Sequence, residues 1–219
     1  MISKWQKYIS YVYPIVLEKG MGKHSSLELL LVNNRLQLAT DKAVYSWEDL
    51  YYPFSFALNK IKRRLNNVES CLIVGMGMGS ISKILYSIQN KKNIQYTAIE
   101  TETLIVDWAK KYLPTQLHQH TTWMNEDAEK AISKIDKKFD LICVDVFVQR
   151  SVPAVFQSKI FIEQCKMLMT ENATLLFNII MADAEKLTND NFENNFSDIF
   201  NKHEKLTIKE NQIWIGYSI

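Results

Sequence analysis

The sequence has few of the features that mark secreted, membrane or nucleic-acid-binding proteins. Its three cysteines are odd in number and lie within apolar stretches, which favours buried, reduced thiols over a disulfide framework. The 26 basic residues nearly balance the 24 acidic ones, and a net charge of +2 is too small to indicate a nucleic-acid partner. We therefore expect a cytoplasmic protein that does not bind nucleic acid.

Long apolar runs and clusters of metal ligands are missing as well. Residues 1–20 contain no long uninterrupted apolar core, and Pro14 interrupts their best apolar stretch. This pattern argues against a signal peptide and against a membrane span, so we expect no membrane partner. His118 and His120 have no acidic or cysteine partners at metal-ligand spacing, so they do not indicate a metal site.

The chain does contain enough apolar residues for a sizeable core, since 47% of its 219 residues are hydrophobic. After residue 68, short apolar runs alternate with segments of helical periodicity. Repeated strand-helix units predict a parallel sheet with helices on both faces. The expected strands are 71–75, 94–100, 120–125, 139–145, 173–180, 205–210 and 213–218, with helices at 80–90, 102–114, 127–135, 158–169 and 191–201.

The first third of the chain has a different pattern. Residues 25–46 indicate strands that meet at Asn33 and Asn34, where positive φ angles suit a tight hairpin. Residues 49–65 have apolar positions at helical spacing. We expect residues 1–66 to form a β-hairpin region with a linking helix, and residues 67–219 to form a nucleotide-binding domain.

The segment 72–80, LIVGMGMGS, places Gly75, Gly77 and Gly79 directly after an apolar strand. Glycines allow a tight turn and a close approach of the backbone to a ligand. A dinucleotide site favours G-x-G-x-x-G, but the sixth position here is Ser80. The observed G-x-G-x-G spacing suits a ligand of the S-adenosylmethionine type better, and a plain tight turn is the alternative.

Acidic residues follow three of the strands that come after the glycine loop. Glu100, Asp127 and Asp145 stand where the second, third and fourth strands end. Because ligands of such sheets bind beyond the carboxyl ends of the strands, we expect these side chains around one nucleoside pocket. The alternative for each is a solvated loop carboxylate, or a helix N-cap in the case of Asp127.

With these motifs in place, the sequence resembles the spermidine synthase-like family of class I S-adenosylmethionine-dependent transferases, over residues 26–180. The resemblance implies a class I methyltransferase-like α/β fold: a doubly wound, mostly parallel sheet of about seven strands, with a C-terminal antiparallel hairpin and a preceding N-terminal β-hairpin region. It assigns these residues to the cofactor site: Gly75, Gly77, Gly79, Glu100, Thr101, Asp127, Ala128 and Asp145.

The resemblance also implies an acceptor site. It places Gln37 and Tyr45 near the substrate and gives Asp145 the position of an active-site aspartate, the candidate catalytic residue. Two carboxylates of the aminopropyl-transferring members are replaced, by Met78 in the glycine loop and by Val148 in the D-x-x-D pattern that starts at Asp145. Both changes weaken the attraction of the pocket for a diamine.

Three functions follow from these observations. The first is methyl transfer from S-adenosylmethionine to a small molecule or a protein side chain, with Asp145 orienting or deprotonating the nucleophile. The second is aminopropyl transfer, of the spermidine synthase type found in polyamine synthesis, with decarboxylated S-adenosylmethionine as donor, methylthioadenosine as product and an altered amine site. The third is a non-catalytic nucleoside-binding protein. The resemblance further suggests a homodimer.

Overall fold

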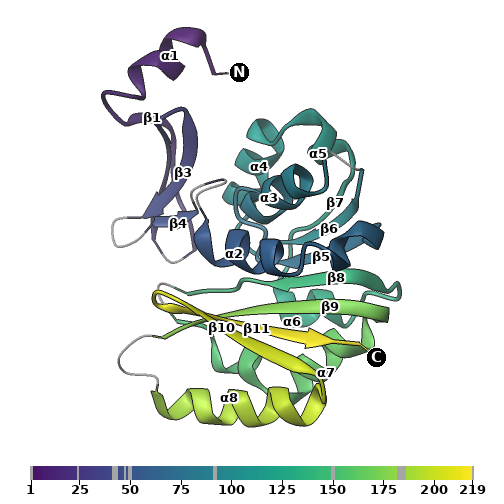
Figure 1. The fold of residues 1–219 in the computed structure, drawn as a ribbon. Helices are drawn as coiled ribbons and strands as arrows, with labels where there is room; N and C mark the ends of the chain where they lie inside the picture. The colour runs from purple at the N-terminus through teal and green to yellow at the C-terminus, as the bar shows by residue number, and fades with distance from the viewer. Residues whose placement is uncertain are drawn as a thin grey trace.

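The structure is a computed structural model that describes residues 2–23, 25–40, 44–46, 48, 51–90, 93–148, 151–181 and 186–218. Within these residues the chain forms two β-sheets with helices around them (Figure 1). The strands are β1 (Ile15–Met21), β2 (Ser26–Val32), β3 (Arg35–Thr40), β4 (Val44–Ser46), β5 (Ser70–Val74), β6 (Gln95–Ile99), β7 (Thr121–Met124), β8 (Phe139–Val144), β9 (Met169–Ile180), β10 (His203–Ile208) and β11 (Asn211–Tyr217). The helices are α1 (Lys4–Ile9), α2 (Tyr52–Lys60), α3 (Ser80–Ile88), α4 (Thr103–Tyr112), α5 (Thr115–Gln119), α6 (Ala128–Ile132), α7 (Lys159–Met167) and α8 (Lys186–Ile199), with 3-10 turns η2 (Arg64–Asn67) and η3 (Ala154–Gln157).

The large sheet has the strand order β10-β11-β9-β8-β5-β6-β7 in the described part of the chain. Strands β7, β6, β5, β8 and β9 are parallel, while β11 and β10 form an antiparallel hairpin at one edge. The expected α/β fold with its C-terminal hairpin is confirmed. The chain order reverses between β5 and β8, so the loops after these two strands open a crevice at their carboxyl ends.

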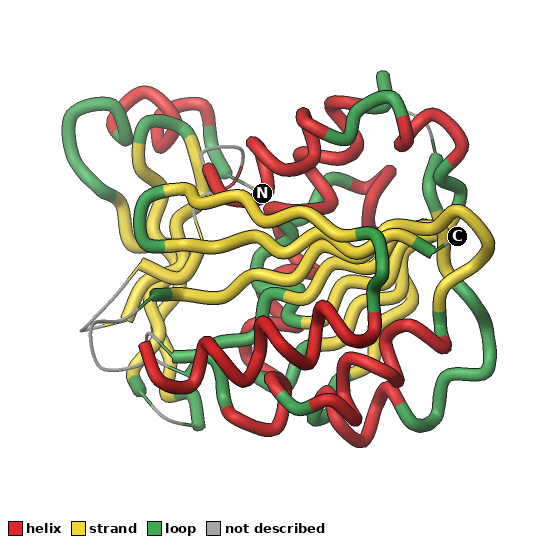
Figure 2. The backbone as a smooth tube through the Cα atoms, turned by 60° about the horizontal axis from the view of Figure 1, so that its bottom comes forward, coloured by secondary structure: helices red, strands yellow, loops and turns green. Residues whose placement is uncertain are grey.

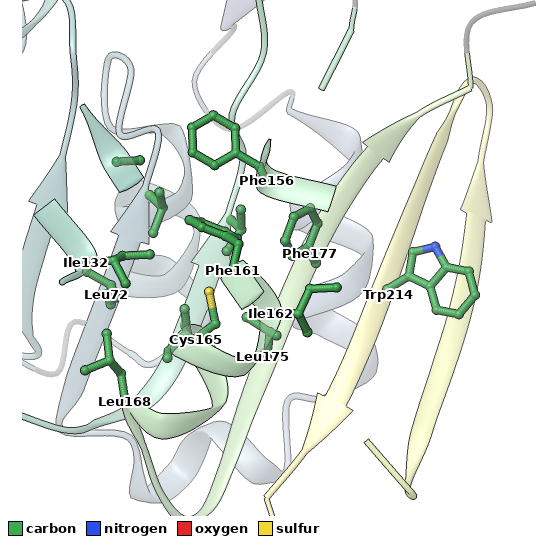
Figure 3. Close-up of a cluster of buried hydrophobic side chains, with 14 of the residues drawn as sticks. Leu72, Ile132, Phe156, Phe161, Ile162, Cys165, Leu168, Leu175, Phe177 and Trp214 are labelled. Carbon is green, nitrogen blue, oxygen red and sulfur yellow. The ribbon is translucent and has the colours of Figure 1, made fainter. Parts of the chain in front are cut away.

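Helices cover both faces of the large sheet (Figure 2). Successive residues of a strand point to opposite faces, and β5 follows this rule: Leu72 and Val74 pack with α6, α7 and α8, whereas Cys71 and Ile73 pack with α2 and α3. Figure 3 shows part of the first layer, with Phe161, Ile162 and Cys165 of α7 gathered near Leu175 and Phe177 of β9. The three cysteines are buried and free, as the apolar setting of each predicts.

The small sheet is built on alternating leucines. Leu27, Leu29 and Leu31 of β2 and Leu36 and Leu38 of β3 are all buried, and they form one cluster with α4. The turn between the two strands has positive φ angles of 51° and 59° at Asn33 and Asn34, so the expected hairpin is confirmed.

The N-terminal region is larger than the expected hairpin. In the described residues four strands pair in the order β1-β2-β3-β4. The sequence did not indicate β1, because a shift in its pairing between Val16 and Glu18 breaks the alternation of buried and exposed residues. Helix α2 packs on the large sheet, and its expected range is too long, since a turn at residues 61–63 separates it from η2. The boundary at residues 66 and 67 stays a prediction.

Candidate functional site

The glycine loop after β5 approaches β8 closely. Gly75, Gly77 and Gly79 have φ angles of 86°, 52° and 81°, which side chains disfavour. A Cβ on Gly75 would lie 2.2 Å from the backbone oxygen of Asp145, so only glycine permits this approach. A Cβ on Gly77 would meet nothing within 4 Å, because that residue faces the open space of a cavity.

The cavity has a volume of about 330 Å³ and lies at the carboxyl ends of the parallel strands. Its walls come from both sheets and from the loops after β5, β6, β7 and β8. The lining residues are Gly22, Lys23, Ser25, Leu27, Leu38, Tyr51, Gly75, Met76, Gly77, Ser80, Ile81, Ile99, Glu100, Thr101, Glu102, Ile105, Glu126, Asp127, Ala128, Glu129, Asp145, Val146, Phe147, Val148, Pro153, Val155 and Phe156.

Most of the sequence-predicted site residues meet at this cavity. Its lining includes Gly75, Gly77, Glu100, Thr101, Asp127, Ala128 and Asp145. Gly79 is outside the lining as described and precedes α3, where a Cβ would lie 2.6 Å from Leu113. Gln37 is also outside it, because it alternates with the inward-facing Leu36 and Leu38. The side chain of Tyr45 lies outside the described residues.

Glu100 is buried at the end of β6 and faces the glycine loop. Its Oε2 accepts a hydrogen bond of 3.0 Å from the Gly77 amide, and its Oε1 accepts one of 3.0 Å from the Glu102 amide. Burial raises the pKa of the Glu100 carboxyl, while these backbone amides oppose that rise. Together with a further backbone hydrogen bond from Thr101, these bonds fix the orientation of the carboxylate, which keeps acceptor capacity for a ligand hydroxyl.

Asp127 serves as the N-cap of α6. Its Oδ1 accepts a hydrogen bond of 3.0 Å from the Glu129 amide, as the N-cap alternative predicts. The residue also lines the cavity together with Ala128, so the same residue caps α6 and forms part of the cavity wall. The start of α6 is therefore held at the cavity by a local hydrogen bond.

Asp145 directly follows β8 and forms a triad with two side chains from distant segments. Its Oδ1 accepts a hydrogen bond of 2.8 Å from the Tyr51 hydroxyl and one of 3.0 Å from Asn178 Nδ2. Burial raises the pKa of the Asp145 carboxyl to about 7, the bonds from Asn178 and Tyr51 lower it, and the charge of Glu100 raises it. Near neutral pH this group can therefore both accept and release a proton.

Tyr51 and Asn178 were not among the site residues that the sequence motifs indicated. Tyr51 precedes α2, in a segment interpreted only through its helical periodicity. Asn178 lies within the apolar strand β9 and is completely buried. A side-chain amide in such a strand requires a buried hydrogen-bond partner. The polar residue in an apolar run was therefore the sequence feature that could have indicated Asn178. Burial, and then the charge of Asp145, raises the pKa of the Tyr51 hydroxyl, so it remains a proton donor to the carboxylate at neutral pH.

The small sheet closes the cavity beside Glu100. The backbone amide of Lys23 donates a hydrogen bond of 2.8 Å to the Glu102 carboxylate. The Lys23 ammonium donates to the backbone oxygen and the hydroxyl of Thr101, at 2.7 and 2.8 Å. The turn between β1 and β2 is therefore attached to the loop after β6.

Met78 lies away from the cavity, although the resemblance places a carboxylate at this position. Its side chain is 1% exposed and packs with the leucines of the small sheet and with Trp108 of α4. The methionine thus contributes to the apolar contact between the two sheets. A carboxylate in this cluster would be desolvated without a partner.

Two findings concern metal ligands and membrane-spanning helices in the described part of the chain. Among the described residues, no three histidine, cysteine or acidic side chains come together as a metal site. No helix within the described ranges is long and apolar enough to span a bilayer. The cytoplasmic location and the homodimer stay predictions.

Comparisons with known proteins agree with this architecture. A probable spermidine synthase from Corynebacterium glutamicum superposes with a TM-score of 0.75 at 13% identity, over 94% of this chain and 81% of that one. The chain has a spermidine synthase-like fold. A spermidine synthase solved in complex with the transition state analogue AdoDATO gives a TM-score of 0.72 at 14% identity, over 93% of this chain and 74% of the other.

Proteins with different reactions share this fold or part of this sequence. Human methyltransferase-like protein 13, solved with SAH, has a TM-score of 0.62 at 16% identity, over 78% of this chain and 82% of that one. A polyamine aminopropyltransferase from Sulfurisphaera tokodaii is 27% identical over 146 residues, 63% of this chain and 45% of the relative. The chain thus spans less than half the length of the curated relatives it matches. No family model matches the sequence.

Proposed function

We propose that this protein transfers an aminopropyl group from decarboxylated S-adenosylmethionine to an amine acceptor. The observation that carries this proposal is the charge of the cavity. In the described lining, six residues carry a carboxylate and one carries an ammonium group. The carboxylates belong to Glu100, Glu102, Glu126, Asp127, Glu129 and Asp145, and the ammonium belongs to Lys23.

This charge distribution favours a donor without an α-carboxylate. Decarboxylated S-adenosylmethionine carries a sulfonium and an ammonium group, and both are attracted to carboxylates. S-adenosylmethionine adds a carboxylate, which needs a donor or a cation. The Lys23 ammonium already donates two hydrogen bonds to Thr101, so it is a poor partner for that group.

The residues at the ends of β5, β6 and β7 fit the nucleoside part of the donor. Gly77 leaves open space where a side chain would project into the cavity. In this proposal the fixed carboxylate of Glu100 accepts the ribose hydroxyls, with Thr101 beside it. Asp127 and Ala128 meet the adenine, and Gly75 and Gly79 permit the turn of the loop.

Asp145 is proposed as the general base. When bound, the donor supplies a carbon next to a sulfonium, which is already activated toward attack. The lone pair of the acceptor amine forms the new nitrogen–carbon bond while the carbon–sulfur bond breaks and its electrons return to sulfur. The proton lost from nitrogen passes to the Asp145 carboxylate and then to water. Tyr51 and Asn178 position this carboxylate through their bonds to Oδ1.

Methyl transfer, the first expectation from the sequence, draws support from the fold alone. The similar human methyltransferase-like protein shares the architecture at 16% identity. Relatives that align by sequence are named for aminopropyl transfer, and the carboxylate-rich cavity favours the same reaction. Aminopropyl transfer is therefore the better supported of the two.

The decisive experiment is a calorimetric titration of the purified protein with three nucleosides in parallel. Decarboxylated S-adenosylmethionine should bind at least about tenfold more tightly than S-adenosylmethionine, because only the latter carries a carboxylate into the acidic cavity. Methylthioadenosine should also bind, because it is the nucleoside product of the proposed transfer. Tighter binding of S-adenosylmethionine would restore methyl transfer, and binding of none of the three would remove both transferase functions.

A further inference from the structure

The cavity has a second side that differs from the nucleoside side. Apolar residues line it after Asp145, where the chain leaves β8 and passes through η3. We call this set the apolar wall; it consists of Val146, Phe147, Val148, Pro153, Val155 and Phe156. Val148 and Val155 keep 43% and 38% of their surface exposed although they line a cavity. Exposed apolar side chains in a concave site are typical of a ligand contact.

The apolar wall is anchored in the core. The rings of Phe156 and Phe161 make an edge contact with centroids 4.9 Å apart, and Phe161 in turn contacts Phe177 of β9. Figure 3 shows these three rings close to one another. Val148 and Ser151 exchange two backbone hydrogen bonds, of 2.9 and 3.2 Å, which fix the backbone at Val148. The wall is therefore formed before any ligand arrives.

Asp145 is the carboxylate of the described lining that is adjacent in the chain to the apolar wall. Glu100 and Glu102 belong to the loop after β6, and the hydrogen bonds from backbone amides hold both. Glu126 forms an ion pair with Lys134, Asp127 caps α6, and Glu129 is exposed in the first turn of α6. An acceptor whose amine reaches Asp145 thus extends its remaining atoms along apolar side chains. A second ammonium group there would lose part of its hydration to apolar side chains, and the wall has no carboxylate to replace that hydration.

We infer that the acceptor is a primary amine whose other end is apolar, an alkylamine or an arylalkylamine, and that Val148 selects it over a diamine. This inference rests on the proposed aminopropyl transfer. The amine is held between Asp145 and the donor carbon, and the apolar end packs on Phe147, Val148 and Val155. Burial of each methylene group against this wall adds to the affinity.

The test compares two acceptors of equal length. n-Pentylamine and 1,4-diaminobutane differ only in the replacement of a terminal methyl group by an ammonium group. Each is titrated into the protein saturated with methylthioadenosine, at about pH 8, where Asp145 is ionised. We expect n-pentylamine to bind at least about tenfold more tightly than the diamine. Equal or tighter binding of the diamine would overturn the inference, and so would a failure of both amines to bind.

A pair of variants tests the role of Val148. Val148→Asp should remove the preference for n-pentylamine and strengthen diamine binding at least about fivefold, because the new carboxylate faces the second ammonium. Asparagine has nearly the same shape as aspartate but no charge, so Val148→Asn should leave diamine binding unchanged. An unchanged preference in Val148→Asp would exclude Val148 as the selecting residue. The partly exposed side chain makes both variants compatible with folding.

Saturation with methylthioadenosine separates this inference from the proposed function. If no nucleoside binds, the proposed transfer fails and the inference fails with it. If the nucleoside binds and the diamine is the preferred amine, only the inference fails. Glu163→Gln provides a control, because Glu163 is exposed and outside the cavity lining, so the loss of its charge should not alter the n-pentylamine preference.

Discussion

The two sides of the cavity are built in different ways. On the proposed nucleoside side, Gly77, Glu100 and Asp127 belong to short loops after successive strands, and backbone amides hold the two carboxylates. On the proposed acceptor side, Asp145 depends on Tyr51, which is 94 residues away in the chain, and on Asn178 of β9. Local motifs therefore define the first side, whereas tertiary packing defines the second. Substitutions on the first side should therefore alter nucleoside affinity, and substitutions on the second side should alter the transfer rate.

The largest effect is expected from Asp145→Asn. Loss of the general base should reduce the transfer rate at least about 100-fold, while methylthioadenosine affinity changes little. The rate and the nucleoside Kd are measured in the same preparation. A normal rate would exclude Asp145 as the base, and a large loss of nucleoside affinity would mean that the two sides are not separate.

The same variant should alter the dependence of stability on pH. In the folded protein the Asp145 pKa is about 7, above the value of about 3.9 in an unfolded chain. The protonated carboxyl therefore stabilises the fold at low pH, and this contribution is lost as the pH rises through 7. Asparagine cannot ionise, so the Tm of Asp145→Asn relative to the natural protein should increase between about pH 5 and pH 8. Thermal melts across this range measure the trend, and a flat difference would contradict the raised pKa.

Met78→Asp should destabilise the protein rather than improve its activity. The substitution places a carboxylate in the leucine cluster between the small sheet and α4, at a cost of more than about 2 kcal/mol in the free energy of unfolding. Met78→Leu keeps the apolar volume and should cost less than about 1.5 kcal/mol. Urea unfolding compares the two variants. Equal stability would show that Met78 is not a core residue.

Glu100→Ala should weaken the nucleoside side alone. Loss of hydrogen bonds to a charged carboxylate costs about 1.5–3 kcal/mol, so methylthioadenosine should bind at least about tenfold more weakly. Glu163→Gln is the control, since that exposed side chain is outside the cavity lining. Calorimetry measures both. Unchanged affinity in Glu100→Ala would remove Glu100 from the ribose site.

Tyr51→Phe should have the smallest effect and should shift the pH profile. Its hydroxyl lowers the Asp145 pKa by donating a hydrogen bond, so its removal should raise the midpoint of the pH–rate profile above about 7. The rate at neutral pH should fall by about three- to tenfold. Tyr52→Phe is the matched control, because Tyr52 is 58% exposed and outside the cavity lining. An unshifted midpoint would exclude the positioning role of Tyr51.

The amino-acid sequence by itself determined the fold class and brought out the residues that we propose for the nucleoside side. Alternating apolar runs reveal parallel strands because each strand is short, buried and bounded by a turn. Glycines and acids at the strand ends come together because the carboxyl ends of parallel strands share one edge of the sheet. The hairpin at Asn33 and Asn34 can also be predicted from local sequence, since few residues tolerate its φ angles.

Only the tertiary structure decided the acceptor side. The bonds of Tyr51 and Asn178 to Asp145 join three segments, and no periodicity links residues so far apart in the chain. The raised pKa of Asp145 also depends on burial, which the packing of the whole domain creates. Met78 shows the same limit, because its motif position implied a cavity residue and the small sheet covered it instead. Side-chain contacts between distant segments depend on packing, and packing is a property of the folded chain.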